Sequence, residues 1–174
     1  MSSPPDGPVW LIGFPGAGKT TVGRLLARLL ERPFVDLDTL IEEQAGCSIA
    51  LLFSREGEEQ FRRHEMRAVA GIVQGKGPSP VVACGGGLVS RKANRERLAA
   101  SGPVFWLDVP WEEAARRCAL QASPRPLLGD PAAFRRRLPR RLFHYRALGR
   151  RVDARLPPGE IAGRIMELLQ HPGD

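Results

Sequence analysis

The segment GFPGAGKT, residues 13–20, constrains the fold more than any other part of this sequence. It follows the apolar run VWLI and precedes a helical apolar pattern, and its glycines, lysine and threonine stand at the positions of the phosphate-binding loop. The glycines let successive backbone N–H groups turn inward around a phosphate, and the amino end of the helix adds its positive dipole. The segment therefore indicates a nucleoside triphosphate site between a strand and a helix, and no more.

Five residues of this segment and the one after it are expected to bind the nucleotide: Gly16, Ala17, Gly18, Lys19, Thr20 and Thr21. Lys19 is placed to reach the β and γ phosphates, and the Thr20 hydroxyl can ligate Mg²⁺. The chain has 26 basic residues, and only Lys19, Lys76 and Lys92 are lysines. A lysine at this position in so arginine-rich a chain independently supports the assignment.

The rest of the chain alternates short apolar strands with helices. Strands are expected at 9–13, 34–36, 81–83, 104–107 and 151–153, and helices at 20–30, 39–45, 56–73, 131–148 and 160–170. This order predicts an α/β fold of three layers, with a central five-stranded parallel sheet of the P-loop NTPase type. Pro139 should kink or split the helix at 131–148. Ligands should bind beyond the carboxyl ends of the strands.

Length and composition predict one globular domain at 8–171, preceded by a short mobile tail at 1–7. No apolar run approaches the ~20 residues of a membrane span, and the first residues lack the pattern of a signal peptide. Cys47, Cys84 and Cys118 do not stand at the close spacing of paired cysteines. This indicates a reducing cytoplasm and argues against both zinc and disulfides. No exposed apolar stripe stands out, so a monomer is expected.

The net charge of +7, from 26 basic and 19 acidic residues, raises the possibility of a nucleic-acid partner. The arginines are spread over several expected helices, with no aromatic-rich strand among them, and RRRLPRR at 135–141 is the strongest basic cluster. A phosphorylated or carboxylated small ligand would use the same charges. We therefore expect a small-molecule substrate and neither nucleic acid nor a membrane.

Candidate acceptor and metal residues lie at other strand ends. Asp36 and Asp38 in FVDLD are two residues apart, so both can point to one side, where one can hold Mg²⁺ and the other can gather hydroxyl groups. Alternatively, they cap the helix that follows. Asp108 is a further metal candidate or a helix cap. The glycines of VVACGGG, residues 81–87, indicate either a loose turn or a rigid ligand against bare backbone.

The pieces GFPGAGKTTVGRLLA, FVDLDTLIEEQAGCSI, GEEQFRRHE, CGGG, RPLL and RRLFHY occur in one order between residues 13 and 153. Together they resemble the shikimate kinase family. The resemblance implies transfer of the γ-phosphate of ATP to the 3-hydroxyl of shikimate, with Asp38 binding ring hydroxyls and helping to deprotonate the attacking one. It also implies that Arg62 and Arg141 hold the carboxylate, while the ring lies along three glycines. Those glycines are Gly85, Gly86 and Gly87.

The resemblance places a lid at about 118–133, a segment with three prolines and no clear helical period. Its Arg125 would neutralise charge on the moving phosphoryl group, which makes Lys19, Asp38 and Arg125 the expected catalytic residues. The expected metal residues are Thr20 and Asp36. Arg117 matches a position that packs on adenine, and Arg155 lies near another adenine contact.

The chain departs from the family pattern behind Arg141. Phe143 and His144 replace the usual Pro and Leu, and the stretch at 145–152 is about one residue short. The Arg141 side chain can therefore point in a different direction from its counterpart in the family. His144 is expected to be a packed or surface histidine. Two other functions stay open: a kinase for another polyol acid such as gluconate, and a kinase-like domain without turnover. Intact Lys19, Asp36, Asp38 and Arg125 argue against the second.

Overall fold

A computed structural model describes residues 7–119 and 131–171, with only the backbone described at 131–135. Five parallel strands form its sheet in the order β2–β3–β1–β4–β5. They are β1 Val9–Ile12, β2 Phe34–Asp36, β3 Val81–Ala83, β4 Val104–Asp108 and β5 Arg150–Asp153. Val9 pairs with Val81, and Trp10 with Val104, so the central strand β1 ends between β3 and β4. The predicted parallel sheet is confirmed.

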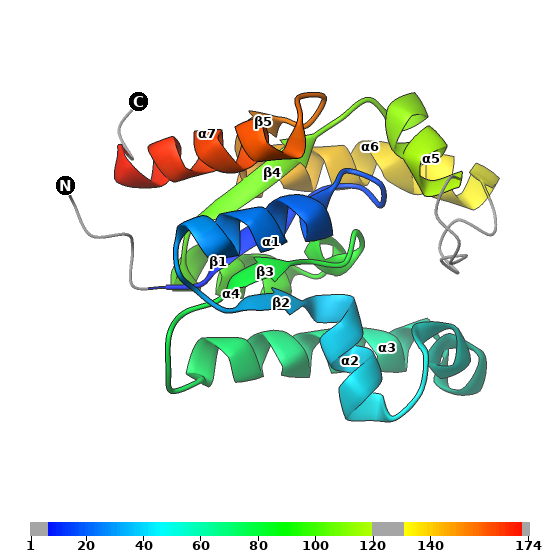
Figure 1. Ribbon diagram of the computed structural model, residues 1–174. Helices are drawn as coiled ribbons and strands as arrows, with labels where there is room; N and C mark the ends of the chain where they lie inside the picture. The colour runs from blue at the N-terminus through cyan, green and yellow to red at the C-terminus, as the bar shows by residue number, and fades with distance from the viewer. Residues whose placement is uncertain (1–6, 120–130, 172–174) are drawn as a thin grey trace.

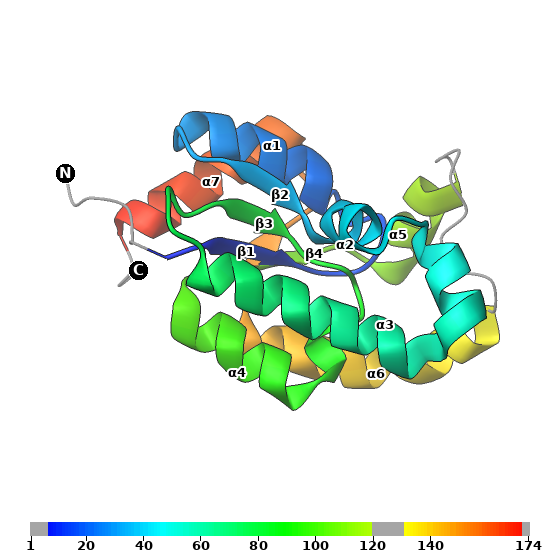
Figure 2. The same ribbon diagram turned by 90° about the horizontal axis from the view of Figure 1, so that it is seen from below.

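Helices cover both faces of this sheet. Figure 2 shows α1 (Lys19–Leu29) and α7 (Pro158–Gln170) on one face, with α3 (Ile49–Gln74), α4 (Lys92–Ser101) and α6 (Pro131–Leu148) on the other. The shorter helices α2 (Leu37–Ala45) and α5 (Trp111–Ala119) lie beyond the carboxyl ends of the strands (Figure 1). A 3₁₀ turn, η1 (Leu88–Ser90), follows β3. This is the predicted three-layer architecture.

The core explains why the strands are continuously apolar. Every residue of β1 and β3 is buried, and Trp10, Val81 and Val82 are 0% exposed. Strands buried on both faces lose the polar and apolar alternation of a half-exposed sheet. From α1, Val22 and Leu26 pack into this core. The carboxyl ends of β1, β2 and β3 are thereby held side by side at one edge.

One helix begins earlier than predicted, and another has its predicted bounds and runs unbroken through a proline. The structure begins α3 at Ile49 rather than at residue 56, because Ser48 caps it by accepting from the Leu51 N–H at 3.3 Å. Gly57, at φ 78° and ψ 175°, interrupts the helical backbone there and divides α3 in two. Pro139, by contrast, does not split α6, which runs through it from Pro131 to Leu148.

The expected boundaries of the tail and the lid also change. Arg32 Nη1 donates a hydrogen bond to the Gly7 carbonyl at 3.0 Å, so Gly7 is tied to the domain, while residues 1–6 lie outside the described part. Cys118 belongs to α5, and residues 131–133 belong to α6. The lid predicted at about 118–133 therefore begins and ends in helical residues, and residues 120–130 lie outside the described part of the chain, so the lid stays a prediction.

None of the described helices is long and apolar enough to cross a bilayer. Cys47, Cys84 and Cys118 form no disulfide within the part of the chain that the structure describes.

Candidate active site

The loop between β1 and α1 has a backbone that only glycine adopts easily. Gly16 and Gly18 have φ angles of 81° and 89°. At Gly16 a Cβ atom would lie 2.2 Å from the Ala114 carbonyl oxygen, so α5 packs directly on the loop. Gly18 caps α1 without a side-chain hydrogen bond, which leaves the first N–H groups of the helix to an anion. This geometry fits a bound phosphate.

Lys19 opens α1 and is held inside the loop. Only 6% of the residue is exposed, and its Nζ donates hydrogen bonds to the carbonyl oxygens of Gly13 at 2.9 Å and Phe14 at 2.7 Å. These oxygens satisfy a buried ammonium group that would otherwise be costly to desolvate. The structure thus keeps a positive charge at the base of the predicted phosphate site.

Thr20 and Asp36, the two predicted metal residues, are in contact. Thr20 Oγ1 donates to Asp36 Oδ2 at 2.7 Å, while Asp36 Oδ1 accepts from the Asp38 N–H at 3.1 Å and caps α2. The two interpretations of Asp36 are therefore compatible. Asp38 lies in the first turn of α2 and not on a strand. The prediction that strand geometry points Asp36 and Asp38 to the same side was therefore wrong. Both aspartates nevertheless line one cavity with the loop, whose other lining residues are Gly16, Gly18, Lys19, Thr20, Thr21, Ala83 and Cys84.

The oxygen atoms of Thr20 and Asp36 fit a magnesium ion. Mg²⁺ prefers hard oxygen ligands, and it commonly takes one or two from the protein and the rest from phosphates and water. Among the described residues, no cluster of three or more His, Cys, Asp or Glu side chains could hold a metal alone. Asp108, the other metal candidate, instead accepts a hydrogen bond at 2.6 Å from Nε of Arg151, which lies on β5. It does not line this cavity.

The three glycines after β3 make room first for the protein's own side chains. A Cβ atom would lie 2.7 Å from Asp38 Oδ1 at Gly85, 2.8 Å from Pro15 Cδ at Gly86, and 2.7 Å from both Arg62 terminal nitrogens at Gly87. None of the three has a positive φ. Close approach, and not backbone strain, therefore requires glycine here. The glycines were expected to make room for a substrate ring. They also make room for Asp38 and Arg62, two predicted substrate residues.

Arg62 is buried between two carboxylates of α3. It is 3% exposed, and it donates from Nη1 to Glu65 Oε2 at 2.7 Å and from Nη2 to Glu58 Oε1 at 3.1 Å. Burial alone would lower the pKa of Arg62, but the two carboxylates outweigh it and raise that pKa. Sequence reasoning missed both glutamates. Their spacing of four and three residues from Arg62 in GEEQFRRHE was the available signal.

Glu65 is the most perturbed of these carboxylates. It is 1% exposed, and burial raises its pKa to about 7, with the charge of Asp38 acting in the same direction and that of Arg62 against it. Buried Cys84 lines the phosphate-loop cavity with Asp38, and burial likewise raises the pKa of its thiol. A carboxyl group that titrates near neutrality beside the predicted hydroxyl-binding aspartate is typical of a functional site.

Arg141 and Tyr145 come from α6 on the far side of the glycines. Arg141 is 3% exposed, and burial lowers its pKa, with Arg62 and Arg137 acting in the same direction and Tyr145 and Glu58 against it. Tyr145 is fully buried and donates from its hydroxyl to the Gly86 carbonyl at 2.5 Å. This bond ties α6 to the glycine loop and brings Arg141 close to Arg62.

The two unusual residues behind Arg141 lie outside the cavity. Phe143 is 68% exposed, and its ring makes an edge contact with His144 at 5.5 Å. His144 is half-buried, and burial lowers its pKa, helped by Arg95 and Arg140. Neither residue lines the loop cavity. This position agrees with the expectation of a packed or surface histidine.

Arg117 and Arg155 are brought to one neighbourhood beside the loop. Arg117 donates from Nη1 to the Ala154 carbonyl at 3.1 Å and from Nε to Glu113 at 2.7 Å, so α5 reaches the segment that carries Arg155. Arg155 itself is exposed and pairs with Asp153. Arg125 lies outside the described residues.

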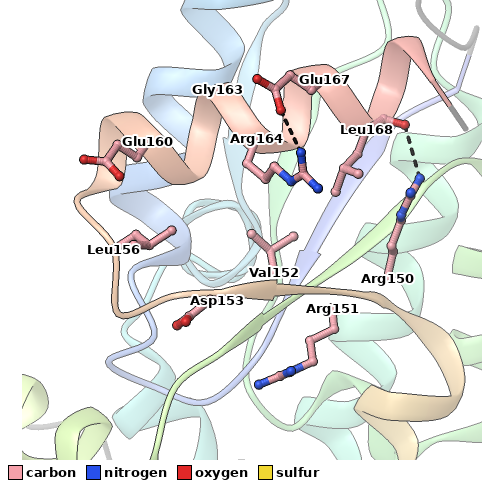
Figure 3. A pocket seen from close by; sticks show the side chains of 10 residues that line it. All are labelled: Arg150, Arg151, Val152, Asp153, Leu156, Glu160, Gly163, Arg164, Glu167 and Leu168. Carbon is pink, nitrogen blue, oxygen red and sulfur yellow. Dashed lines mark hydrogen bonds and ion pairs between the residues drawn. The ribbon is translucent and has the colours of Figure 1, made fainter. Parts of the chain in front are cut away.

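A separate hollow lies between β5 and α7 (Figure 3). Its arginines are engaged within the fold, since Arg164 pairs with Glu167 and Arg150 donates to the Leu168 carbonyl. None of the predicted site residues lines it.

The three-layer fold with a phosphate loop at the end of β1 defines the class of P-loop kinases. Thr20 and Asp36 are the predicted metal residues of this chain, and the buried Arg62 and Arg141 are its predicted acid-binding residues. Comparison with known proteins gives the family. The shikimate kinase family model matches residues 15–170, and the chain belongs to that family.

Sequence relatives agree along most of the chain. A shikimate kinase of Symbiobacterium thermophilum is 44% identical over 170 residues, covering 94% of this chain and 97% of the relative. Among solved structures, the shikimate kinase of Acinetobacter baumannii in complex with shikimate has a TM-score of 0.88 at 34% identity, covering 96% and 94% of the two chains. A gluconokinase of Sinorhizobium meliloti has a TM-score of 0.59 at 18% identity over 97% and 98%, which shows the fold alone.

Proposed function

We propose that this protein transfers the γ-phosphate of ATP to the 3-hydroxyl of shikimate, giving shikimate 3-phosphate and ADP. Membership of the shikimate kinase family supports this activity. The observation that carries it in this chain is the pair Arg62 and Arg141, each 3% exposed. Arg62 lies against Gly87, in the same loop as Gly85, which lies against Asp38 of the phosphate-loop cavity. Two buried guanidinium groups near a phosphate site suit an acceptor with a carboxylate.

The loop residues would bind and orient the phosphates. The backbone from Gly16 to Thr21 would surround them, and Lys19 would move from its two carbonyl partners to the β and γ phosphates. Thr20 and Asp36 would hold Mg²⁺, which when bound neutralises charge on the transferred phosphoryl group. Arg117 and Arg155 would contact the adenine from the side of α5.

Asp38 would orient the attacking hydroxyl and accept its proton. Its carboxylate lines the same cavity as Lys19 and lies against Gly85, so a ring bound along the glycines has this oxygen at its edge. Arg62 and Arg141 would bind the carboxylate bidentately. The proton leaves the hydroxyl oxygen for the Asp38 carboxylate as that oxygen attacks the phosphorus. Arg125 would stabilise the charge on the phosphoryl group, a role that rests on the family resemblance alone.

We further propose a cytoplasmic monomer with no nucleic-acid or membrane partner. The large exposed apolar residues of the described part are scattered over several elements, which supports a monomer: Leu29, Leu51, Val73, Phe143 and Leu156.

A coupled ADP-release assay tests the activity. Shikimate, gluconate and nucleoside monophosphates are each supplied with ATP and Mg²⁺. Of these acceptors, we expect turnover only with shikimate. The Lys19→Met variant should lose nearly all turnover, because it removes the charge from the phosphates. Preference for gluconate or a nucleotide, or near-normal turnover of Lys19→Met, would overturn the proposal.

A further inference from the structure

Glu58 holds two arginines of the acid-binding region at once. Its Oε1 lies 3.1 Å from Arg62 Nη2, and its Oε2 lies 3.6 Å from Arg137 Nη2. Arg62 belongs to α3 and Arg137 to α6. One carboxylate on α3 therefore bridges the two helices that supply the proposed carboxylate site.

The two carboxylates on Arg62 differ in accessibility. The Glu65 side chain is 1% exposed and holds Nη1 from inside the core, while the Glu58 side chain is 47% exposed. Rotating Glu65 away would bury a charge without its partner, which is costly. Rotating Glu58 away moves it into water. The edge of Arg62 at Nη2 is therefore the one that an incoming ligand can take.

The surroundings of Glu58 favour a negative charge. Burial alone would raise the pKa of Glu58, but Arg62, Arg137 and Arg141 outweigh it and lower that pKa. The group is thus a carboxylate at neutral pH, which is the group that the substrate would bring to the same arginines. Two carboxylates cannot use Arg62 Nη2 together, because their charges repel and the guanidinium edge fits one.

Glu58 can leave without moving its helix. It is the first residue after Gly57, where the backbone of α3 departs from helical geometry. From there to Gln74 the helix carries Glu58 and Arg62 one turn apart, so only side-chain torsions separate them.

We propose that Glu58 competes with the substrate for Arg62: its carboxylate occupies the arginine site in the acid-free enzyme and is replaced by the carboxylate of the substrate. The contact holds Arg62 and Arg137 in place. An acid must displace Glu58 to bind, which weakens its affinity, while a ligand without a carboxylate leaves Glu58 in place. This inference rests on the proposed shikimate kinase function.

Calorimetric titration of the nucleotide-free protein tests the inference with shikimate and its methyl ester. Glu58→Gln and Glu58→Ala should bind the acid roughly three- to tenfold more tightly than wild type, which is the scale of a half-exposed ion pair. Affinity for the ester should stay within about twofold. In steady state the gain should lower KM for shikimate, with kcat changing less.

Glu59→Gln is the matched control. It removes the same charge one residue along, but Glu59 is 62% exposed and pairs with Arg91 outside the site. It should leave acid binding within about twofold of wild type, which separates a local contact from a general loss of negative charge. Circular dichroism confirms that each variant is folded.

Weaker or unchanged acid binding in both Glu58 variants would overturn the inference. It would mean that Glu58 only orients Arg62, or that it stays in place beside the substrate. Equal gains for acid and ester would overturn it too. If wild type neither binds nor phosphorylates shikimate, the proposed function fails and the inference with it, an outcome visible before any variant is compared.

Discussion

Single residues of this site carry more than one role. Asp36 accepts from Thr20 Oγ1 and caps α2 with its other oxygen. Because Asn caps a helix about as well as Asp, the charge of Asp36 can be removed without removing the cap. The two aspartates of FVDLD can therefore be separated by substitution.

We predict that Asp38→Asn lowers turnover by about two decades or more, because a general base is lost, and that it weakens shikimate binding. Asp36→Asn should stay folded, and raised Mg²⁺ should partly restore its activity. Titrating each variant with shikimate and with Mg²⁺ separates the roles. Rescue of Asp38→Asn rather than Asp36→Asn by Mg²⁺ would show that the assignments are reversed.

The buried carboxyl group of Glu65 leads to a second prediction, which concerns how the free energy of unfolding depends on pH. Its pKa is about 7 when folded, against a value of 4.5 for an unperturbed glutamate. The folded state therefore binds more protons between these values, so the stability from protonated Glu65 is full below pH 4.5 and is lost as pH rises through 7.

Denaturant unfolding at several pH values measures this effect. Between pH 4.5 and 8 the free energy of unfolding of wild type should fall relative to Glu65→Gln by up to about 3 kcal/mol. The comparison cancels groups that titrate alike in both proteins. Parallel curves for the two proteins would show that Glu65 keeps its charge when folded.

At the scale of elements, one loop couples four parts of the chain. The glycines after β3 contact Asp38 of α2, Pro15 of the phosphate loop and Arg62 of α3, and Tyr145 of α6 donates to the carbonyl of the middle glycine. A Cβ atom on any of the three glycines would lie within 2.8 Å of a neighbouring side chain. The loop sets the spacing between the nucleotide and acceptor halves.

We predict that Gly87→Ala displaces the Arg62 guanidinium and raises KM for shikimate by at least about tenfold, with little change in KM for ATP. Gly87 has φ −97° and ψ −7°, which alanine adopts, so the effect comes from the 2.7 Å contact and not from strain. Kinetics with each substrate varied in turn measure it.

Gly71→Ala provides the control for that substitution. Gly71 lies in α3, and a Cβ atom there would meet nothing within 4 Å. Alanine should therefore stabilise the protein by roughly 0.5–1 kcal/mol and leave both KM values alone. A shift in the KM for ATP in Gly87→Ala would indicate that the whole loop moved.

The whole molecule has one core for both halves of the site. Buried apolar residues from Val9 to Leu169 form a single cluster in the described part of the chain. A domain with one core is expected to unfold in one cooperative step, and any ligand that binds only the folded state should raise its stability by mass action.

We predict a single thermal transition that moves upward by roughly 5–10 °C at 100-fold excess of shikimate over its Kd. Arg62→Lys at the same shikimate concentration should gain much less, because lysine keeps the charge but loses the bidentate fork. Scanning calorimetry measures both. Two transitions in the wild type would contradict the single-domain prediction.

The sequence by itself determined the sheet, its helical layers and the phosphate loop. Each rests on local information: apolar runs of strand length, helical periodicity, and glycines whose backbone angles no other residue adopts easily. Asp36 beside Thr20 followed from the same rule, because parallel strands end at one edge. The shared role of Arg62 and Arg141 was implied only by the resemblance to the shikimate kinase family.

Only the tertiary structure decided what surrounds those residues. Glu58 and Glu65 look like solvated charges in GEEQFRRHE, yet one is half-exposed and the other is 1% exposed. That difference depends on which face of α3 meets the sheet and on Asp38 arriving from α2. The glycines likewise needed the contacts of three other elements to show what they accommodate. Burial and long-range contact set the charge state and reach of a side chain, and neither is written in its local sequence.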